Sequence, residues 1–379
     1  MMTTTKAVTR EASSKEKPFH IVKRTDMPTW KSWMIRILSV LASLIVCAII
    51  IVLVTGDNPL EVYGTMIKGA VGSARRVWVL LQEVALLLCV SLAVTPAFKM
   101  RFWNIGAEGQ VLMGGLGATA VMLLLGHKLP APVVLVLVIV VSILCGAIWG
   151  VIPAVFKAFW NTNETLFTLM MNYIAIQIVS YFTYVWSSNK GNNVINTINT
   201  DNHAGWLNLP QSVDKYGYLL NIIIVAVLTV LMYFYLNRSK QGYEIAVVGE
   251  SVNTARYAGI NVKKVIIRTM LISGALCGVA GMLLVSGTDH TITPNTAAGR
   301  GFTAIMVSWL AKFNPLFMVL TSLLLVFMER GAIEISTVFG LNTSFSEIIA
   351  GIIIFFIIGS EFFINYSIKR THAKEVESK

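Results

Sequence analysis

The chain has 379 residues, of which 55% are hydrophobic and only 13% charged. An ordinary soluble domain carries roughly 25% charged residues, so this composition excludes a soluble enzyme and predicts a membrane protein. The formal net charge of +11 does not indicate nucleic-acid binding, because the basic residues gather at the chain ends and in one central loop, as the positive-inside rule expects of cytoplasmic segments.

Residues 1–33 are polar and rich in lysine. This stretch is too long and too charged for the first part of a signal peptide, so we expect a cytoplasmic tail that stays in the mature protein. A membrane domain over residues 34–365 and a second cytoplasmic tail over 366–379 follow.

Hydrophobic runs near the length of about 20 residues that crosses a bilayer predict an all-α, polytopic transmembrane helical bundle. Ten spans are preferred and nine are possible, with both termini cytoplasmic. The run at 301–312 is the weak one, because about twelve residues extend only about 18 Å; it is expected to be a broken or half helix. The predicted spans are 34–55, 77–98, 104–126, 131–157, 165–187, 218–236, 266–286, 301–312, 316–333 and 346–365.

Two connections stand out in this scheme. Residues 56–76 contain Arg75 and Arg76 on the predicted outer side, against the charge bias, and their amphipathic pattern favours an interfacial or re-entrant helix. Residues 187–217 are rich in Asn, Thr and Ser without apolar periodicity, so they predict a long exposed loop. That loop either meets a partner outside the membrane or is a plain solvated connector.

The third span begins with three polar residues, Asn104, Glu108 and Gln110. One interpretation is structural: Asn104 is the N-cap, and Glu108 interacts with the helix dipole. The other is functional, because ionisable groups within a membrane usually face partners or a watery cavity, where they would bond a polar substrate. The remaining polar candidates within the spans are Glu83, Asn172, Gln177 and Glu329.

Phe302 and Trp309 lie on the short run. Aromatic faces stack on planar ring systems, so both are candidates for the substrate path, with core packing as the alternative. The glycines of the third span and of 273–281 are explained by close helix packing.

The polar segment at 237–265 joins the sixth and seventh spans and is expected in the cytoplasm. Ser251 or Asn253 is suited to cap a short helix there, and Gly259 to end it. Such a helix, lying across the membrane face, moves as a rigid body when a partner protein pushes it.

Five stretches resemble one transporter family: "FWNIGAEGQVLMGG", "NETLFTLMMNYIA", "GYEIAVVGESVNTARYAGINV", "SGALCGVAG" and "GRGFTAIMVSWLAKFNP". Together, over about residues 75–365, they are similar to permeases of ABC transporters for branched-chain amino acids, sugars and nucleosides, most of all to the longer nucleoside permease subunit. Glu244 and Ile245 lie where many relatives carry arginine, so no cation role is expected there.

The resemblance implies an importer in the cell membrane, with a second, different permease, ATP-binding subunits and an extracellular lipoprotein that binds a nucleoside. It also implies that the central loop is the contact with the ATPase, through Gly249, Glu250, Asn253, Ala255, Ala258 and Gly259. The substrate path is expected among Glu83, Asn104, Glu108, Gln110, Asn172, Phe302 and Trp309.

No Gly-Lys dipeptide occurs, so the phosphate-binding loop of ATPases is missing, and no nucleophile or metal motif is present. We therefore expect no catalytic residue, metal or cofactor, with ATP used by a partner subunit. The four cysteines lie in apolar runs and are expected in the core. Two alternatives stay open: an ion-coupled transporter that relays charge through Glu83, Glu108 and Glu329, and a sugar permease of the same family.

Overall fold

The computed structural model describes residues 19–24, 27–187, 194–209 and 217–370, and most of these are helical. The chain divides into two compact units, residues 1–62 with 344–379 and residues 63–343.

The first unit pairs the two ends of the chain. It contains α1 (Thr29–Val54) and α13 (Thr343–Asn365), and Arg36 Nη2 on α1 lies 2.5 Å from Glu361 Oε1 on α13. β1 (Phe19–Lys23) and β2 (Tyr366–Arg370) form an antiparallel pair in which Phe19 is opposite Arg370. The all-α prediction holds apart from these two short strands, which were not expected because pairing between distant chain ends leaves no local signal. α1 begins at Thr29, inside the tail expected over residues 1–33.

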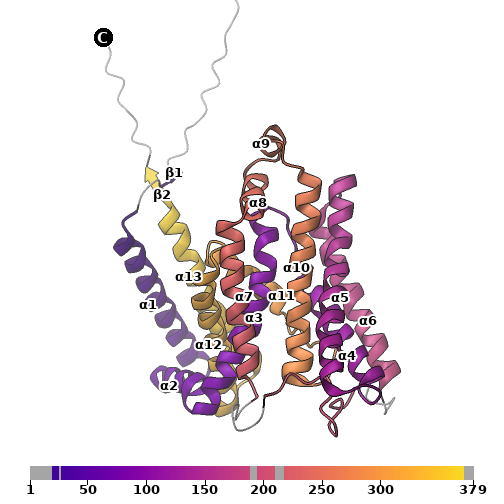
Figure 1. The fold of residues 1–379 in the computed structure, drawn as a ribbon. Coiled ribbons are helices and arrows are strands. Elements are labelled where there is room, and N and C mark those ends of the chain that lie inside the picture. Colours follow the sequence, from indigo (N-terminus) through magenta and orange to yellow (C-terminus); the bar gives the residue numbers. More distant parts are fainter. Residues whose placement is uncertain (1–18, 25–26, 188–193, 210–216, 371–379) are drawn as a thin grey trace, which may run out of the picture. The chain divides into compact units, whose positions relative to one another are not determined.

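The second unit is a helical bundle (Figure 1). Its elements, the first of which begins in the other unit, are α2 (Pro59–Val71), α3 (Ala74–Lys99), α4 (Ala107–Leu125), α5 (Ala131–Trp160), α6 (Glu164–Trp186), α7 (Leu219–Arg238), α8 (Lys240–Glu250), α9 (Val252–Tyr257), α10 (Val262–Leu284), the π-helix η1 (Val285–Asp289), α11 (Arg300–Leu310) and α12 (Pro315–Phe339).

Small residues let the central helices of this unit approach closely. A Cβ atom built on Gly278 of α10 would lie 2.3 Å from the carbonyl oxygen of Ser142 on α5, and one on Gly274 would lie 2.4 Å from that of Gly146. Backbone-to-backbone contact of this kind is how membrane helices associate, since lipid gives them no hydrophobic driving force. The predicted packing role of these glycines is confirmed.

Within the described residues, nine helices are long and apolar enough to cross a membrane. Nine of the ten predicted runs are therefore helices of membrane-crossing length, in line with the predicted nine or ten spans, and the tenth run falls short. The reason is α11, which has 11 residues and so extends only about 16 Å, as the weak run at 301–312 predicted. The side on which each terminus lies stays a prediction.

The connection at 56–76 contains the expected amphipathic helix, α2. Arg76, just after it, is held by an ion pair of 2.8 Å between its Nη2 and Glu334 Oε1 of α12, and its Nη1 donates to the Lys68 carbonyl over 2.8 Å. Arg75 and Arg76 line a hollow of about 330 Å³ between α2, α3 and α12. Arg76 is thus used in helix packing, which explains why a cation here runs against the charge bias.

The prediction of a solvated loop at 187–217 is partly wrong. Its described part, 194–209, folds against the end of the bundle: Ile198 and Leu207 are buried, and their amides donate to the carbonyls of His290 and Ser286 over 2.9 and 2.8 Å. Asn199 donates to the Met122 carbonyl over 2.9 Å. Side-chain amides such as that of Asn199 help to hold this segment in place. The sequence therefore lacks the apolar periodicity that would have predicted a packed segment. Residues 188–193 and 210–216 lie outside the described part of the chain.

Candidate functional site

Glu108 joins the first turns of two helices. It lies in the first turn of α4, and its Oε1 and Oε2 accept hydrogen bonds from the amides of Gly299 and Gly301 at the start of α11, over 2.8 and 2.7 Å. The side chain is 8% exposed. A carboxylate so placed satisfies two orphan amides and faces the positive ends of both helix dipoles. The predicted dipole role is present, but it extends to a second helix 191 residues away in sequence.

Asn104 is not the N-cap of α4, contrary to the structural interpretation of the sequence. The helix begins at Ala107 with Gly106 as its N-cap, because Asn104 Oδ1 instead accepts from the Gly106 amide over 3.1 Å and turns the chain before the helix starts. Gln110 Nε2 donates to the same oxygen over 3.2 Å, and Asn104 Nδ2 lies 3.3 Å from Ser273 Oγ on α10. Asn104 and Gln110 are buried and link α4 to α10.

The contact between the starts of α4 and α11 around Glu108, with Asn104 and Gln110 beside it, is called the junction below. Asn172 on α6 lies on the other side of this junction. Its Oδ1 accepts from the Gly109 amide over 2.8 Å, and its Nδ2 donates to the Ile105 carbonyl over 2.8 Å. Thr168, one turn earlier, accepts from the Ile105 amide over 3.2 Å. Both polar atoms of the Asn172 amide are therefore used to hold the chain that enters α4.

Glu83 of α3 lies between two arginines. Its Oε2 is 2.5 Å from Arg300 Nη2 of α11, and its Oε1 is 2.6 Å from Arg330 Nη2 of α12. The sequence singled out the carboxylate but missed both cations. The available signal was two charges within predicted spans, Glu83 and Arg330, with Arg300 at the edge of a third, because such charges usually pair with one another.

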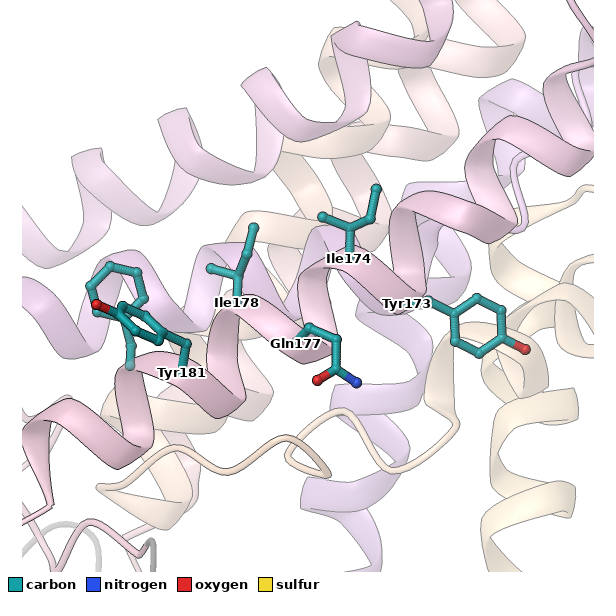
Figure 2. Close-up of a pocket in the computed structure, with 6 residues that line it drawn as sticks. Tyr173, Ile174, Gln177, Ile178 and Tyr181 are labelled. Atoms are coloured by element: carbon teal, nitrogen blue, oxygen red, sulfur yellow. The ribbon is translucent and has the colours of Figure 1, made fainter. Parts of the chain in front are cut away.

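Gln177 and Glu329 do not join this junction. Both side chains are exposed. Figure 2 shows Gln177 on the outer surface of α6 beside Tyr173 and Tyr181, at an apolar hollow of about 440 Å³. Residues of one helix alone line it, so it is a surface groove and not a buried chamber.

Phe302 and Trp309 lie on an exposed stripe of α11. Phe302 is 46% exposed, Met306 39% and Trp309 49%, whereas Val307, which follows Met306 on the helix, is fully buried. Trp309 also packs on Phe98 and Trp103, with ring centroids 6.5 and 5.8 Å apart. Core packing thus accounts for one side of Trp309 and leaves the other open.

The central loop contains two helices where one was predicted. The loop is shorter than 237–265, because α7 continues to Arg238 and α10 begins at Val262. α8 was not expected, while α9 has the predicted N-cap: Ser251 Oγ accepts from the Thr254 amide over 3.2 Å. Gly259 follows α9 with φ +75°, as the predicted left-handed terminator. Figure 1 shows both helices at one end of the bundle.

The six predicted coupling residues divide into anchors and exposed groups. A Cβ on Gly249 would lie 2.1 Å from the Lys99 carbonyl oxygen of α3, and Ala255 is fully buried, so these two fix the segment to the bundle. The other four are exposed: Glu250, Asn253, Ala258 and Gly259.

Glu244 holds this segment to the bundle, which the sequence did not reveal. Its Oε2 lies 2.9 Å from Arg268 Nη2 of α10, and both side chains are about four-fifths buried, with 18% and 22% exposed. The sequence analysis expected no cation role at position 244, and Glu244 is indeed the acidic member of this ion pair. The sequence did not reveal this pair because Arg268 lies 24 residues from Glu244, too far for a local sequence pattern to link them.

A stack of aromatic rings marks the opposite end of the unit. The His290 and Trp206 rings are parallel within 4° with centroids 3.7 Å apart, and His203 lies on Trp206 at 4.4 Å. Burial, with a smaller contribution from nearby His203, lowers the pKa of His290 from 6.5 to about 4. His290 is therefore neutral at physiological pH. Among the described residues, no group of three or more His, Cys, Asp and Glu side chains forms a metal site.

The family model for the branched-chain amino acid transport system permease component matches residues 78–358, three-quarters of the chain. The chain belongs to this permease family. Its members are transporters, so the nine long helices form a multi-pass protein of the cell membrane, as predicted.

Three relatives cover most of this permease. The guanosine ABC transporter permease protein NupP of Bacillus subtilis is 30% identical over 82% of this chain and 89% of its own length. The nucleoside ABC transporter permease protein NupB of Lactococcus lactis is 27% identical, with coverage of 81% and 86%. The glucose ABC transporter permease protein TsgB13 of Haloferax volcanii is 28% identical, with coverage of 91% and 92%. No solved structure matches the chain.

Proposed function

We propose that this permease forms one half of the translocation path of an ATP-driven nucleoside importer. The observation that carries the proposal is the similarity to guanosine and nucleoside permeases over four-fifths of the chain. Motifs spread from residue 102 to residue 315 agree with it, and they include both the junction at Glu108 and the segment α8–α9.

The substrate path runs along the exposed stripe of α11. Phe302 and Trp309 offer aromatic faces at half-exposed positions, and such faces stack on nucleobases whatever their hydrogen-bonding pattern. Asn104, Glu108, Gln110 and Asn172 are already hydrogen-bonded within the bundle. Glu108 holds the start of α11, while Asn104, Gln110 and Asn172 hold α4, which carries Glu108. Glu83 also holds α11, through Arg300.

The segment α8–α9 is the contact with a separate ATP-binding subunit. Gly249 and Ala255 anchor it, while Glu250, Asn253, Ala258 and Gly259 meet the partner. Movement of α9 then passes through α8 and the Glu244–Arg268 ion pair to α10, which packs at the centre of the bundle. Rigid elements joined in this way rock a bundle about a central site.

The permease partner is a second, different chain. Lactococcus lactis and Haloferax volcanii each have a second matching permease, 24% identical to this chain in both cases, which supports a heterodimer. An extracellular lipoprotein would deliver the nucleoside.

A sugar permease is the second candidate, because the haloarchaeal glucose permease covers 91% of this chain. Uptake of labelled guanosine, uridine and glucose separates the two. Cells that lack only this chain are expected to lose nucleoside uptake and to regain it on complementation. Loss of glucose uptake alone would favour the sugar permease, and uptake that survives ATP depletion would favour ion coupling.

Coupling is tested by Ala258→Asp. Ala258 is exposed, so the variant is expected to fold and to reach the membrane, yet uptake should fall by at least about tenfold because a buried charge at the ATPase contact costs well over 1.4 kcal/mol. Lys128→Asp, an exposed position at the other end of the unit, is the control. Normal uptake by a well-expressed Ala258→Asp variant would contradict the proposed contact.

A further inference from the structure

Two adjoining hollows, together called the groove, follow α5 and α10 on the surface of the second unit. One part, of about 590 Å³, is lined by three cations, Lys263, Lys264 and Arg268, with Phe159 beside them. The next part, of about 450 Å³, is lined only by apolar side chains of α5 and by Leu271. Leu271 lines both, so the basic part adjoins the apolar part.

The basic part has a surplus of positive charge. Arg268 is neutralised by Glu244 over 2.9 Å, and Lys157 at the end of α5 pairs with Glu164 over 2.9 Å. Lys263 lies over the ring of Phe159, 4.8 Å from its centroid. Within the described part of the chain, Lys263 and Lys264 have no carboxylate partner, and both are exposed. Two ammonium groups are thus free for an anion.

The apolar part has the length of an acyl chain in one leaflet. It extends from Leu144 to Phe156 along α5, about 18 Å at 1.5 Å per residue, and half of a hydrocarbon core is about 15 Å. Ile148 and Leu144 are 61% and 53% exposed, so the groove opens to its surroundings along its length.

We propose that this groove binds one anionic phospholipid, with its phosphate between Lys263 and Lys264 and an acyl chain along α5. The charge selects an acidic headgroup, and basic pockets between membrane helices hold such headgroups. A soluble phosphate compound would use the basic part alone and would leave the adjoining apolar groove without a role, which is why the lipid is the occupant we infer.

Native mass spectrometry of the purified full-length chain tests the headgroup. Dioleoyl phosphatidylglycerol is compared with dioleoyl phosphatidylcholine, which has the same acyl chains. The wild type is expected to retain the anionic lipid preferentially, and K263Q/K264Q to lose about tenfold or more of that preference. The control K68Q/K128Q removes two other exposed lysines and is expected to behave as the wild type. Equal loss in both double variants, or no preference in the wild type, overturns the proposal.

A second variant and a soluble competitor test the acyl chain. Val151→Trp fills the apolar part while leaving both lysines in place, and it is expected to reduce retention of phosphatidylglycerol several-fold. Glycerol 3-phosphate at millimolar concentration is expected not to displace the lipid. Unchanged retention in Val151→Trp, or full displacement by glycerol 3-phosphate, would show a site for a soluble anion and overturn the lipid assignment.

Discussion

The junction around Glu108 and the segment α8–α9 use the same residue types in opposite ways. At the junction, Asn104, Glu108 and Asn172 are buried and hydrogen-bonded to backbone or side-chain groups of neighbouring elements. On α8–α9, Glu250 and Asn253 are exposed. The difference shows that buried polar side chains in a membrane bundle first serve the fold, because hydrocarbon does not solvate unpaired backbone amides. Contacts with partner proteins are to be sought where polar side chains are exposed.

Replacing Glu108 is expected to give the largest effect. Glu108→Ala leaves the Gly299 and Gly301 amides without partners, and two charge-assisted bonds contribute about 3 kcal/mol or more together. Thermal unfolding in detergent is expected to shift markedly to lower temperature. Glu250→Ala removes the same carboxylate from the exposed segment and is expected to leave the unfolding temperature unchanged. Equal shifts would remove the distinction between the two regions.

Packing at the junction is tested by Gly301→Ala. A Cβ there would lie 2.5 Å from the Glu108 backbone nitrogen, and overpacking of this kind costs about 1–3 kcal/mol. The matched control is Gly64→Ala, because a Cβ on Gly64 meets nothing within 4 Å. The same measurement applies, and a Gly301→Ala protein as stable as Gly64→Ala would argue against the close approach of α4 and α11.

The tie between α8 and α10 is expected to contribute less. Glu244→Gln removes the carboxylate from Arg268, and a partly exposed ion pair contributes about 1 kcal/mol. A double-mutant cycle with Arg268→Gln is expected to give a coupling free energy of that size. A coupling near zero would mean that α8 is held by packing around the buried Ile245 and not by charge.

Acidification is expected to give the smallest effect, through His290. Its pKa is about 4 in the folded protein against 6.5 for the free side chain, so between these values the unfolded state binds more protons. The contribution of neutral His290 to the free energy of unfolding is therefore expected to be fully present above pH 6.5. It is expected to decrease slightly as the pH falls toward 4. Because the ring is partly exposed, the loss is small.

Fluorescence of the stacked indole checks the pH prediction. The emission difference between the wild type and Trp206→Phe is expected to change between pH 7 and pH 4, and His290→Asn, which tolerates the left-handed backbone at this position, is expected to abolish that change. A pH response that persists in His290→Asn would contradict its assignment to His290.

The sequence by itself determined the membrane class, the approximate positions of the long helices, the short α11 and the caps of α9. These signals are local: hydropathy acts over one helix, and Ser251 and Gly259 act within a single turn of it. Only the tertiary structure decided what the buried polar groups do. Asn104 was wrongly predicted to be the N-cap of α4. The partners of Glu83, Glu108 and Glu244 were not predicted. Each of those bonds joins helices far apart in sequence, and a buried charge is satisfied by whichever donor the packing brings within reach.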